Sequence, residues 1–337
     1  MKEVVSQPAE KSSRRVFSKV AVGILSLVVL AAGFGAWSYV NSVREGKNCK
    51  DLLGDERVEK ALGAGYRSDL SCAQLGNAVK RATMGSVARE HSLDQARSMQ
   101  SLLTVMSEQV SENASELDVD LAVPFSDALA DYAEDMDQIL ASVNVEYIRR
   151  DTSSTSPWQD EDGVHMAVSL ESLLQVMRSL SESSAAYAIL RESITQEIAG
   201  RLAETSPDAE KEKLSLLAKL SSRVLGNFDA VAEKARGEGG GAGVWDRDVL
   251  ARLTKKKVNV PPYSKDGAGH LVASWDRKVR VEGKNGDALS LFEIQGTEMT
   301  RTWSTGMGLG RELSDSLVGD SLNSASWGRS SALRLLG

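Results

Sequence analysis

The two cysteines of this sequence are its strongest candidates for covalent chemistry. Cys49 and Cys72 lie well apart in the chain and lack the C-x-x-C spacing that redox and zinc sites use. In an oxidising compartment such a lone pair is typical of a disulfide, and closing the loop between them would stabilise the fold by about 3 kcal/mol. We therefore predict a Cys49–Cys72 disulfide; the alternative is two unrelated buried thiols in a reducing cytosol.

The three histidines are the next candidates, as general bases or metal ligands. His91, His165 and His270 lie in separate segments, and none belongs to an H-E-x-x-H, G-x-S-x-G or S-x-x-K arrangement with its partners. We expect each of them at the surface or at a helix end. The sequence thus predicts no catalytic, cofactor-binding or metal-binding residue, although a site assembled from distant residues stays open.

Carboxylates are concentrated in two stretches that could be taken for metal or acid–base clusters. The first stretch, 122–143, contains Asp127, Asp131, Glu134, Asp135 and Asp137. Their spacing matches no ordered ligand pattern, so we interpret them as the solvated faces of a helix. The second stretch, 160–162, lacks the later glutamate of a calcium loop, and we expect it to complement the N-terminus of the helix that follows.

The elements that would position these residues begin with a long apolar segment. Residues 20–40 form 21 consecutive uncharged, mostly apolar positions, which as a helix of about 31 Å would cross a bilayer. Because the run is longer than a secretory signal core, we expect a retained transmembrane helix and not a cleaved leader. Trp37 and Tyr39 stand near its end, where aromatic side chains favour the membrane interface.

Basic residues indicate the orientation of this segment. The residues before it are Lys2, Lys11, Arg14, Arg15 and Lys19, and those after it are Arg44, Lys47 and Lys50. The excess on the N-terminal side predicts a cytoplasmic basic tail, 1–19, and an extracytoplasmic bulk of the chain. Small residues spaced four apart, such as Ala31 and Gly35, could let two such helices pack as a homodimer.

Residues 41–236 show a succession of amphipathic helical patterns. The clearest apolar stripe consists of Phe125, Leu129, Tyr132, Met136 and Ile139. Pro124 suits the first turn of that helix. A long helix is expected from about Val164 to Leu202, and another from Ser206 and Pro207. Several long helices with short links predict an antiparallel bundle whose start is clamped by the disulfide.

The glycine-rich stretch 237–243 interrupts the helical pattern and is interpreted as a flexible linker. It lacks the Gly-Lys-Ser/Thr ending of a phosphate-binding loop. Residues 244–337 are expected to form a smaller, mainly helical module. Within it, 276–295 could be a hairpin or two helices, and the spacing of Leu289 and Phe292 favours helices.

Tryptophans recur through this last module. They are Trp245, Trp275, Trp303 and Trp327. We interpret them as the local core of the module; a carbohydrate-binding groove lined by tryptophan is the alternative.

The stretches "PFSDALADYAEDMDQIL" and "SLSESSAAYAILRESITQEIAGRL" resemble long helical proteins of actinomycetes, many of them membrane-anchored and without assigned activity. The resemblance covers about half the chain and consists of the spacing of Ala, Tyr, Leu and acidic residues. It implies an all-helical build and carries over no cofactor and no site residue.

The net charge of −7 excludes a general attraction to nucleic acid. We therefore expect an all-α, single-pass membrane protein that presents an extracytoplasmic helical module to protein partners, as a scaffold, sensor or assembly factor, and that is not an enzyme. One alternative is a cell-envelope enzyme such as a wall-polymer hydrolase. Another is a membrane-docked component of a cytosolic machine.

Overall fold

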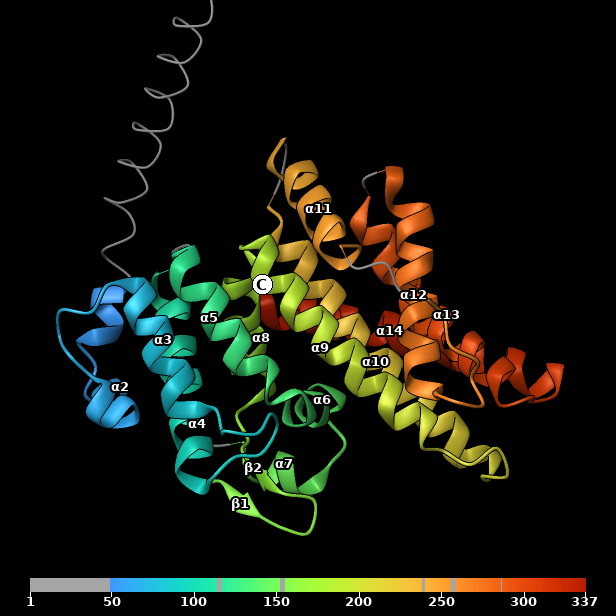
Figure 1. Cartoon of the computed structure of the whole chain (residues 1–337), viewed down its shortest axis with the longest axis horizontal. Coiled ribbons are helices and arrows are strands. Elements are labelled where there is room, and N and C mark those ends of the chain that lie inside the picture. Colours follow the sequence, from blue (N-terminus) through green and yellow to red (C-terminus); the bar gives the residue numbers. More distant parts are fainter. Residues whose placement is uncertain (1–48, 114–116, 152–154, 238–239, 256–258, 286) are drawn as a thin grey trace, which may run out of the picture. The chain divides into compact units, whose positions relative to one another are not determined.

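The computed structural model describes residues 49–113, 117–151, 155–237, 240–255, 259–285 and 287–337. They belong to the compact unit Asn48–Gly337, and they are helical apart from one short hairpin (Figure 1). This confirms the predicted all-α class. In the described part of the chain, no helix has the length and apolar character to cross a bilayer. The predicted tail 1–19 and segment 20–40, with Trp37 and Tyr39, lie outside the described residues.

The first described helices are tied together by the predicted disulfide. Residues 49–53 are helical, α2 covers Glu56–Leu62, and α3 covers Cys72–Thr83. A disulfide joins Cys49 to Cys72, whose Cα atoms are 5.5 Å apart. Ser71 begins α3 with a capping box, since its side chain accepts from the backbone N–H of Gln74 while the Gln74 side chain accepts from that of Ser71. α4, Leu93–Asn113, follows.

The stretch 119–141 forms two helices where one was predicted. α5 is Val119–Ala130 and α6 is Ala133–Ala141. The break falls at Asp131, whose carboxylate accepts from the backbone N–H of Arg89 and whose carbonyl contacts the imidazole of His91. These contacts draw Asp131 out of the helical hydrogen-bond pattern. Pro124 lies inside α5 and not in its first turn, because α5 begins at Val119.

The expected helix from Val164 to Leu202 is also divided. α7, Val145–Arg149, is followed by β1, Trp158–Gln159, and β2, Val164–His165, which pair antiparallel. Gly163 has a φ of 147°, a conformation that favours glycine and that turns the chain between the strands. α8, Leu170–Ser181, and α9, Ser184–Ala203, complete the stretch. The two helices are separate because Ser183 takes the N-cap position of α9.

α10, Lys211–Ala235, begins later than predicted. Ser206 and Pro207 form a turn before it, in which the Ser206 hydroxyl accepts from the backbone N–H of Asp208. The side chain of Ser206 is therefore used in a local turn and does not cap the helix.

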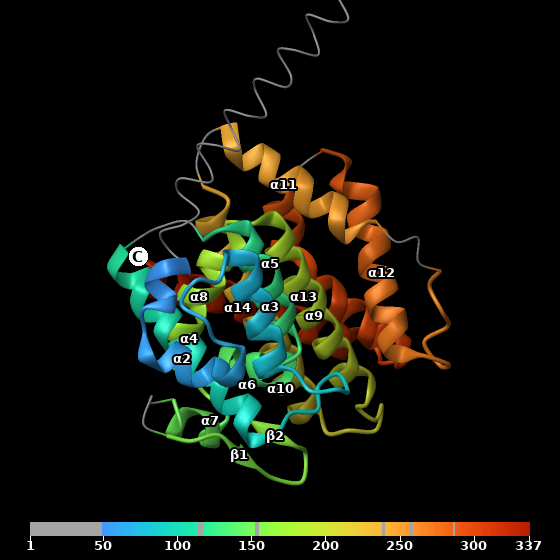
Figure 2. The ribbon, with the colours of Figure 1, turned by 60° about the vertical axis from the view of Figure 1, so that its left-hand side comes forward.

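The remaining helices do not form a separate module. α11 is Gly240–Leu253, α12 is Gly267–Glu282, α13 is Ala288–Gly306 and α14 is Arg311–Leu336, with the short 3-10 turn η2, Gly283–Asn285, between α12 and α13. Residues 276–295 are thus two helices, as the spacing favoured. α13 and α14 pack on α10, so both predicted modules share one compact unit (Figures 1 and 2).

The structure also differs from the prediction that 237–243 form a flexible linker. α11 begins within it, at Gly240. The indole of Trp245 is buried, packs on Tyr187 and donates to the carbonyl of Ser181, while Val249 is fully buried. This burial outweighs the low helix propensity of the glycines. Trp275 and Trp303 are buried as well, whereas Trp327 is half exposed and stacks beneath the guanidinium of Arg223.

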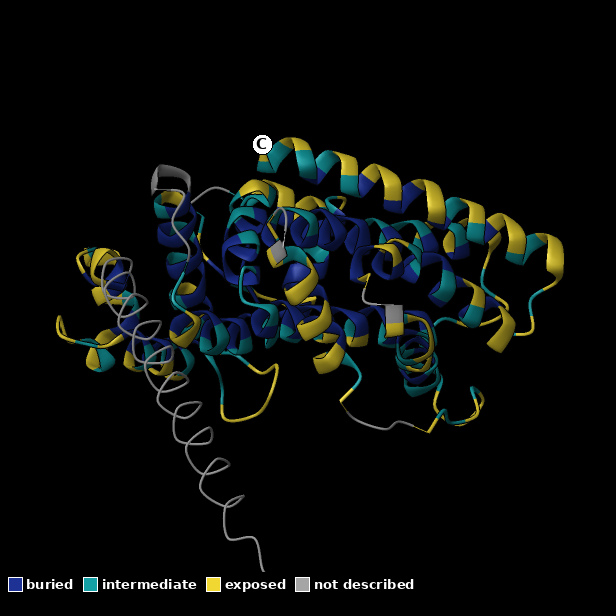
Figure 3. Cartoon of the chain, turned by 90° about the horizontal axis from the view of Figure 1, so that it is seen from above, coloured by how far each residue is buried: buried dark blue, intermediate teal, exposed yellow. Residues whose placement is uncertain are grey.

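Helices α10 and α14 approach each other along a seam of small residues. The buried residues of α14 are Leu317, Ser321, Ser324, Ala325, Gly328 and Ala332. A Cβ added to Gly226 of α10 would lie 2.1 Å from the carbonyl oxygen of Ala325, and one added to Gly328 would lie 2.4 Å from that of Arg223. Only glycine permits this separation of the two backbones. The opposite side of α14, which ends at the C-terminus, is exposed along its length (Figure 3).

A buried guanidinium joins α9, α10 and α13. Arg191 of α9 is 1% exposed and donates to the carboxylate of Asp229 at 2.7 Å and to the side-chain carbonyl of Gln295 at 2.8 Å. It also donates to the hydroxyl of Tyr187 at 3.0 Å and to the backbone carbonyl of Phe292 at 3.3 Å, and it lies over the Phe292 ring. Burial opposes its charge, but Tyr187 and Asp229 outweigh this and raise the pKa of Arg191.

The helix seam predicts opposite outcomes for the same substitution at two glycines of α14. Gly328→Ala places a methyl group against the backbone of α10, so we expect the free energy of unfolding to fall by about 1–3 kcal/mol. Gly319→Ala meets no atom within 4 Å and raises helix propensity, so we expect a gain of about 0.5–1 kcal/mol. Urea unfolding of the two variants measures both changes. Equal effects of the two substitutions would contradict the close approach of α10 and α14.

Candidate functional site

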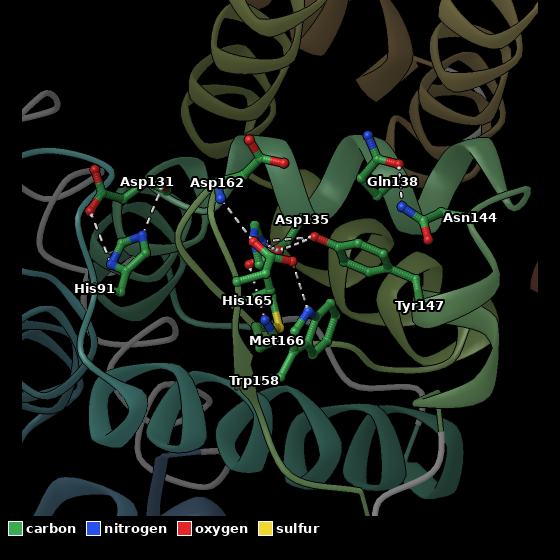
Figure 4. Close-up of polar contacts among 11 residues, drawn as sticks. His91, Asp131, Asp135, Gln138, Asn144, Tyr147, Trp158, Asp162, His165 and Met166 are labelled. Carbon is green, nitrogen blue, oxygen red and sulfur yellow. Dashed lines mark hydrogen bonds and ion pairs between the residues drawn. The ribbon is translucent and has the colours of Figure 1, made fainter.

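Three short elements meet around one buried polar cluster: α6, α7 and the β1–β2 hairpin (Figure 4). Ser142 ends α6 in a left-handed conformation. Asn144 then caps α7 by accepting from the backbone N–H of Glu146, and its amide donates to the side-chain carbonyl of Gln138 on α6. This double use of Asn144 sets α7 against the end of α6.

Asp135 of α6 is the centre of the cluster and is 3% exposed. Its Oδ1 accepts from the hydroxyl of Tyr147 at 2.6 Å and from Nδ1 of His165 at 3.1 Å. Its Oδ2 accepts from the backbone N–H of Met166 at 3.3 Å. A buried carboxylate requires such donors, because water no longer solvates its charge.

His165 is held at both ring nitrogens. Its Nδ1 contacts Asp135, and its Nε2 lies 3.1 Å from Oδ1 of Asp160, a half-exposed carboxylate in the hairpin turn. Asp160 is itself fixed, since it accepts from the backbone N–H of Asp162 and from the indole N–H of Trp158. With a carboxylate at each nitrogen, the doubly protonated imidazolium is the form that satisfies both contacts.

The electrostatics agree with this geometry. The hydrogen bond to Asp135 is the main cause that raises the pKa of His165 to about 9, with burial opposing it and Asp160 adding to it. Burial opposes ionisation of Asp160, but the Asp162 N–H and His165 outweigh it and lower the pKa of Asp160. Burial and the nearby Asp135 raise the pKa of Tyr147, so its hydroxyl stays a donor.

Aromatic side chains enclose the imidazole. Trp158 faces His165 across the hairpin in register, with ring centroids 5.3 Å apart, and Tyr147 meets Trp158 edge-on at 4.9 Å. The guanidinium of Arg150 covers the Trp158 ring at 4.9 Å. These contacts exclude water and strengthen the charge pairing inside.

The geometry of this cluster suits a structural role better than a catalytic one. A general base needs a free nitrogen lone pair near its substrate, and the imidazolium of His165 offers none. Of the described residues, only Asp135, Tyr147 and Asp160 hydrogen-bond to its ring, and none of them is a serine or cysteine nucleophile. Within the described ranges, no three His, Cys, Asp or Glu side chains are placed to hold a metal ion.

A second histidine lies at the junction of α5 and α6. The ring of His91 stacks on Tyr132 at 3.8 Å, and its Nε2 lies 3.3 Å from the backbone carbonyl of Asp131. Its Nδ1 stays 3.8 Å from the Asp131 carboxylate, beyond hydrogen-bond distance. The Tyr132 hydroxyl donates to the carbonyl of Thr83. His91 therefore fastens the loop before α4 to the break between α5 and α6.

The structure confirms one predicted site and corrects two expectations. Cys49 and Cys72 form the disulfide. His165 is buried and not at the surface, because two carboxylates compensate its charge. Asp135 and Asp137 are likewise buried and not solvated; Asp137 pairs with Arg201 of α9. Burial of a carboxylate is stable when such a partner is present.

The spacing of apolar residues around Asp137 indicates that this residue is buried, although its charge favours an exposed position. Ala133, Asp137 and Leu140 are spaced by four and three, so Asp137 shares a helix face with two apolar residues. All three are buried. No comparable signal marks His165 or Tyr147, because short loops of irregular length bring them to Asp135.

Comparisons with protein-family models, with curated proteins and with solved structures found no match to this chain. The interpretation of the cluster therefore depends on its own geometry and on the chemistry of its side chains.

The cluster predicts a loss of stability in alkaline solution. His165 has a pKa of about 9 when folded and about 6.5 when unfolded. Its stabilising contribution is therefore complete below about pH 6.5 and is lost as the pH rises through 9. We expect it to reach about 3 kcal/mol. Urea unfolding of the chain across this pH range measures the loss.

Two variants test whether His165 is the group that causes this pH dependence. His165→Gln removes the titrating group and should flatten the stability profile between about pH 6.5 and 9. His270→Gln is the matched control, because the His270 ring contacts the carbonyl of Pro261 and the Tyr263 ring and has no carboxylate partner among the described residues. This variant should keep the wild-type profile. A wild-type slope in His165→Gln would show that another group titrates.

Proposed function

We propose that this chain is a single-pass membrane-anchored protein whose helical domain lies outside the cytoplasm and binds other proteins there, as a scaffold, sensor or assembly factor. The membrane segment is residues 20–40, and the N-terminal tail 1–19 is cytoplasmic in this proposal. The lipid bilayer and a protein partner are its binding partners, and small residues in the segment allow a homodimer.

The observation that carries this proposal is the Cys49–Cys72 disulfide. Cys49 follows closely on the apolar segment, and both cysteine residues are buried in the helical domain, with exposures of 2% and 8%. Structural disulfides persist in oxidising compartments and are rare in the cytosol. A disulfide next to the segment therefore supports an extracytoplasmic domain and agrees with the excess of basic residues before the segment.

The interior of the domain favours binding over catalysis. Its buried charges are paired with one another, as in the His165 cluster and in the Arg191 network. Large apolar side chains are exposed on separate helices: Val145 on α7, Val281 on α12 and Leu322 on α14. An anchored, compact domain with such contact points suits the presentation of a surface to a partner.

Topology can be tested with single cysteines added to the wild-type chain. Ser316→Cys lies on the exposed side of α14, so an impermeant maleimide should label it in intact cells. Ser12→Cys in the predicted cytoplasmic tail should become labelled only after lysis. The native cysteines give little background, since they are oxidised and buried. Labelling of Ser12→Cys but not Ser316→Cys in intact cells would reverse the proposed orientation.

Partner binding can be tested by photocrosslinking of the full chain in its own membrane. A photoreactive residue replaces Val145, Val281 or Leu322 in turn. Each of these residues is on a different helix and is more than half exposed. We expect one discrete adduct from one of these faces, with the other positions serving as matched controls. The absence of any discrete adduct at all three would contradict a stable protein partner.

A further inference from the structure

A cleft with basic side chains is lined by residues of α11, α12 and η2. Its volume is about 550 Å³, which lies in the range of small-molecule sites. The residues that line it are Gly243, Arg247, Leu250, Ala251, Thr254, Val279, Arg280, Gly283 and Lys284. Three of these carry a positive charge and none is acidic, so the cleft attracts anions.

The charge of this region differs in sign from that of the whole chain. Residues 244–284 contain ten Lys and Arg and five Asp and Glu, a net charge of +5, whereas the whole chain carries −7. Two cations of the cleft, Arg247 and Lys284, make no ion pair or hydrogen bond with any described residue. Their neighbours Arg236 and Lys278 are paired, with Asp246 and Glu282 respectively.

The floor and walls of the cleft leave room for a ligand. Leu250 and Val279 are buried beneath it and give an apolar floor. Gly243 contributes only backbone to the wall, and a Cβ added there would meet no atom within 4 Å. An anion could therefore enter the cleft beside the unpaired cations without displacing a side chain from the core.

We propose that this cleft binds a phosphate-bearing anion. A guanidinium offers a planar fork of donors that matches two phosphate oxygens, and an ammonium adds a point charge. Arg247 supplies the fork from α11, and Lys284 supplies the ammonium from η2. A soluble phosphate compound and a lipid phosphate headgroup share this chemistry. The proposal does not depend on the protein-binding function.

Calorimetry of the full chain in non-ionic detergent tests the site. The probes are inorganic pyrophosphate and a short-chain phosphatidylglycerol, with the zwitterionic phosphatidylcholine of the same chain length as the reference. The double variant Arg247→Gln/Lys284→Gln should weaken binding of the anionic probe by about tenfold or more. Binding of pyrophosphate alone indicates a soluble ligand, and binding of the anionic lipid alone indicates a headgroup; no binding of either overturns the proposal.

A matched control separates a built site from general attraction. Arg252→Gln/Lys265→Gln removes the same charge from exposed residues of the same region that do not line the cleft, and it should leave binding unchanged. Gly243→Leu should weaken binding by filling the cleft without altering the charge. An equal loss in the control, or full binding by Gly243→Leu, would show that the cleft is not the site. Thermal unfolding verifies that each variant is folded.

Discussion

The buried guanidinium of Arg191 is the constraint on which the arrangement of this domain depends. A charge removed from water is stable only if its donors are satisfied, and here the acceptors come from α9, α10 and α13 together. Separation of α9 from α10 would leave an uncompensated charge in the core, and separation of α13 would leave guanidinium N–H groups without acceptors. Residues before and after the glycine-rich stretch 237–243 are therefore held in a single unit, although the stretch itself has the composition of a linker.

The position of α10 has consequences at the distant polar cluster. The side chain of Asn227 donates to the carbonyl of Leu140, and the guanidinium of Arg223 donates to that of Ala141. Both carbonyls belong to the last turn of α6, where no backbone donor remains. The neighbouring Gly226 of α10 is close to the backbone of α14, so α6 and α14 both pack on this segment of α10. α6, and with it Asp135, is placed by a helix that begins some seventy residues later in the chain.

Sequence periodicity predicted what is buried better than where helices end. The stripe Phe125, Leu129, Tyr132, Met136 and Ile139 is buried throughout. Yet the helix that carries it is broken at Asp131, because groups of Arg89 and His91, about forty residues earlier, contact that residue. The disulfide was predictable, since two cysteines allow one pairing. The His165 cluster was not, since its members are brought together by a hairpin and a five-residue helix with no periodic pattern.

The same residue types have different roles in the two charged regions of this domain. At His165, carboxylates on both sides compensate the imidazolium, and aromatic rings exclude water, so the charges stabilise the fold. At the α11–α12 cleft, Arg247 and Lys284 line the same cavity as Gly243, and no acidic residue is among the lining residues. Charge that is compensated internally cannot contribute much to binding, whereas uncompensated charge beside a cleft keeps its attraction for a ligand. This difference in compensation is why we assign a structural role to the histidine cluster and a binding role to the cleft.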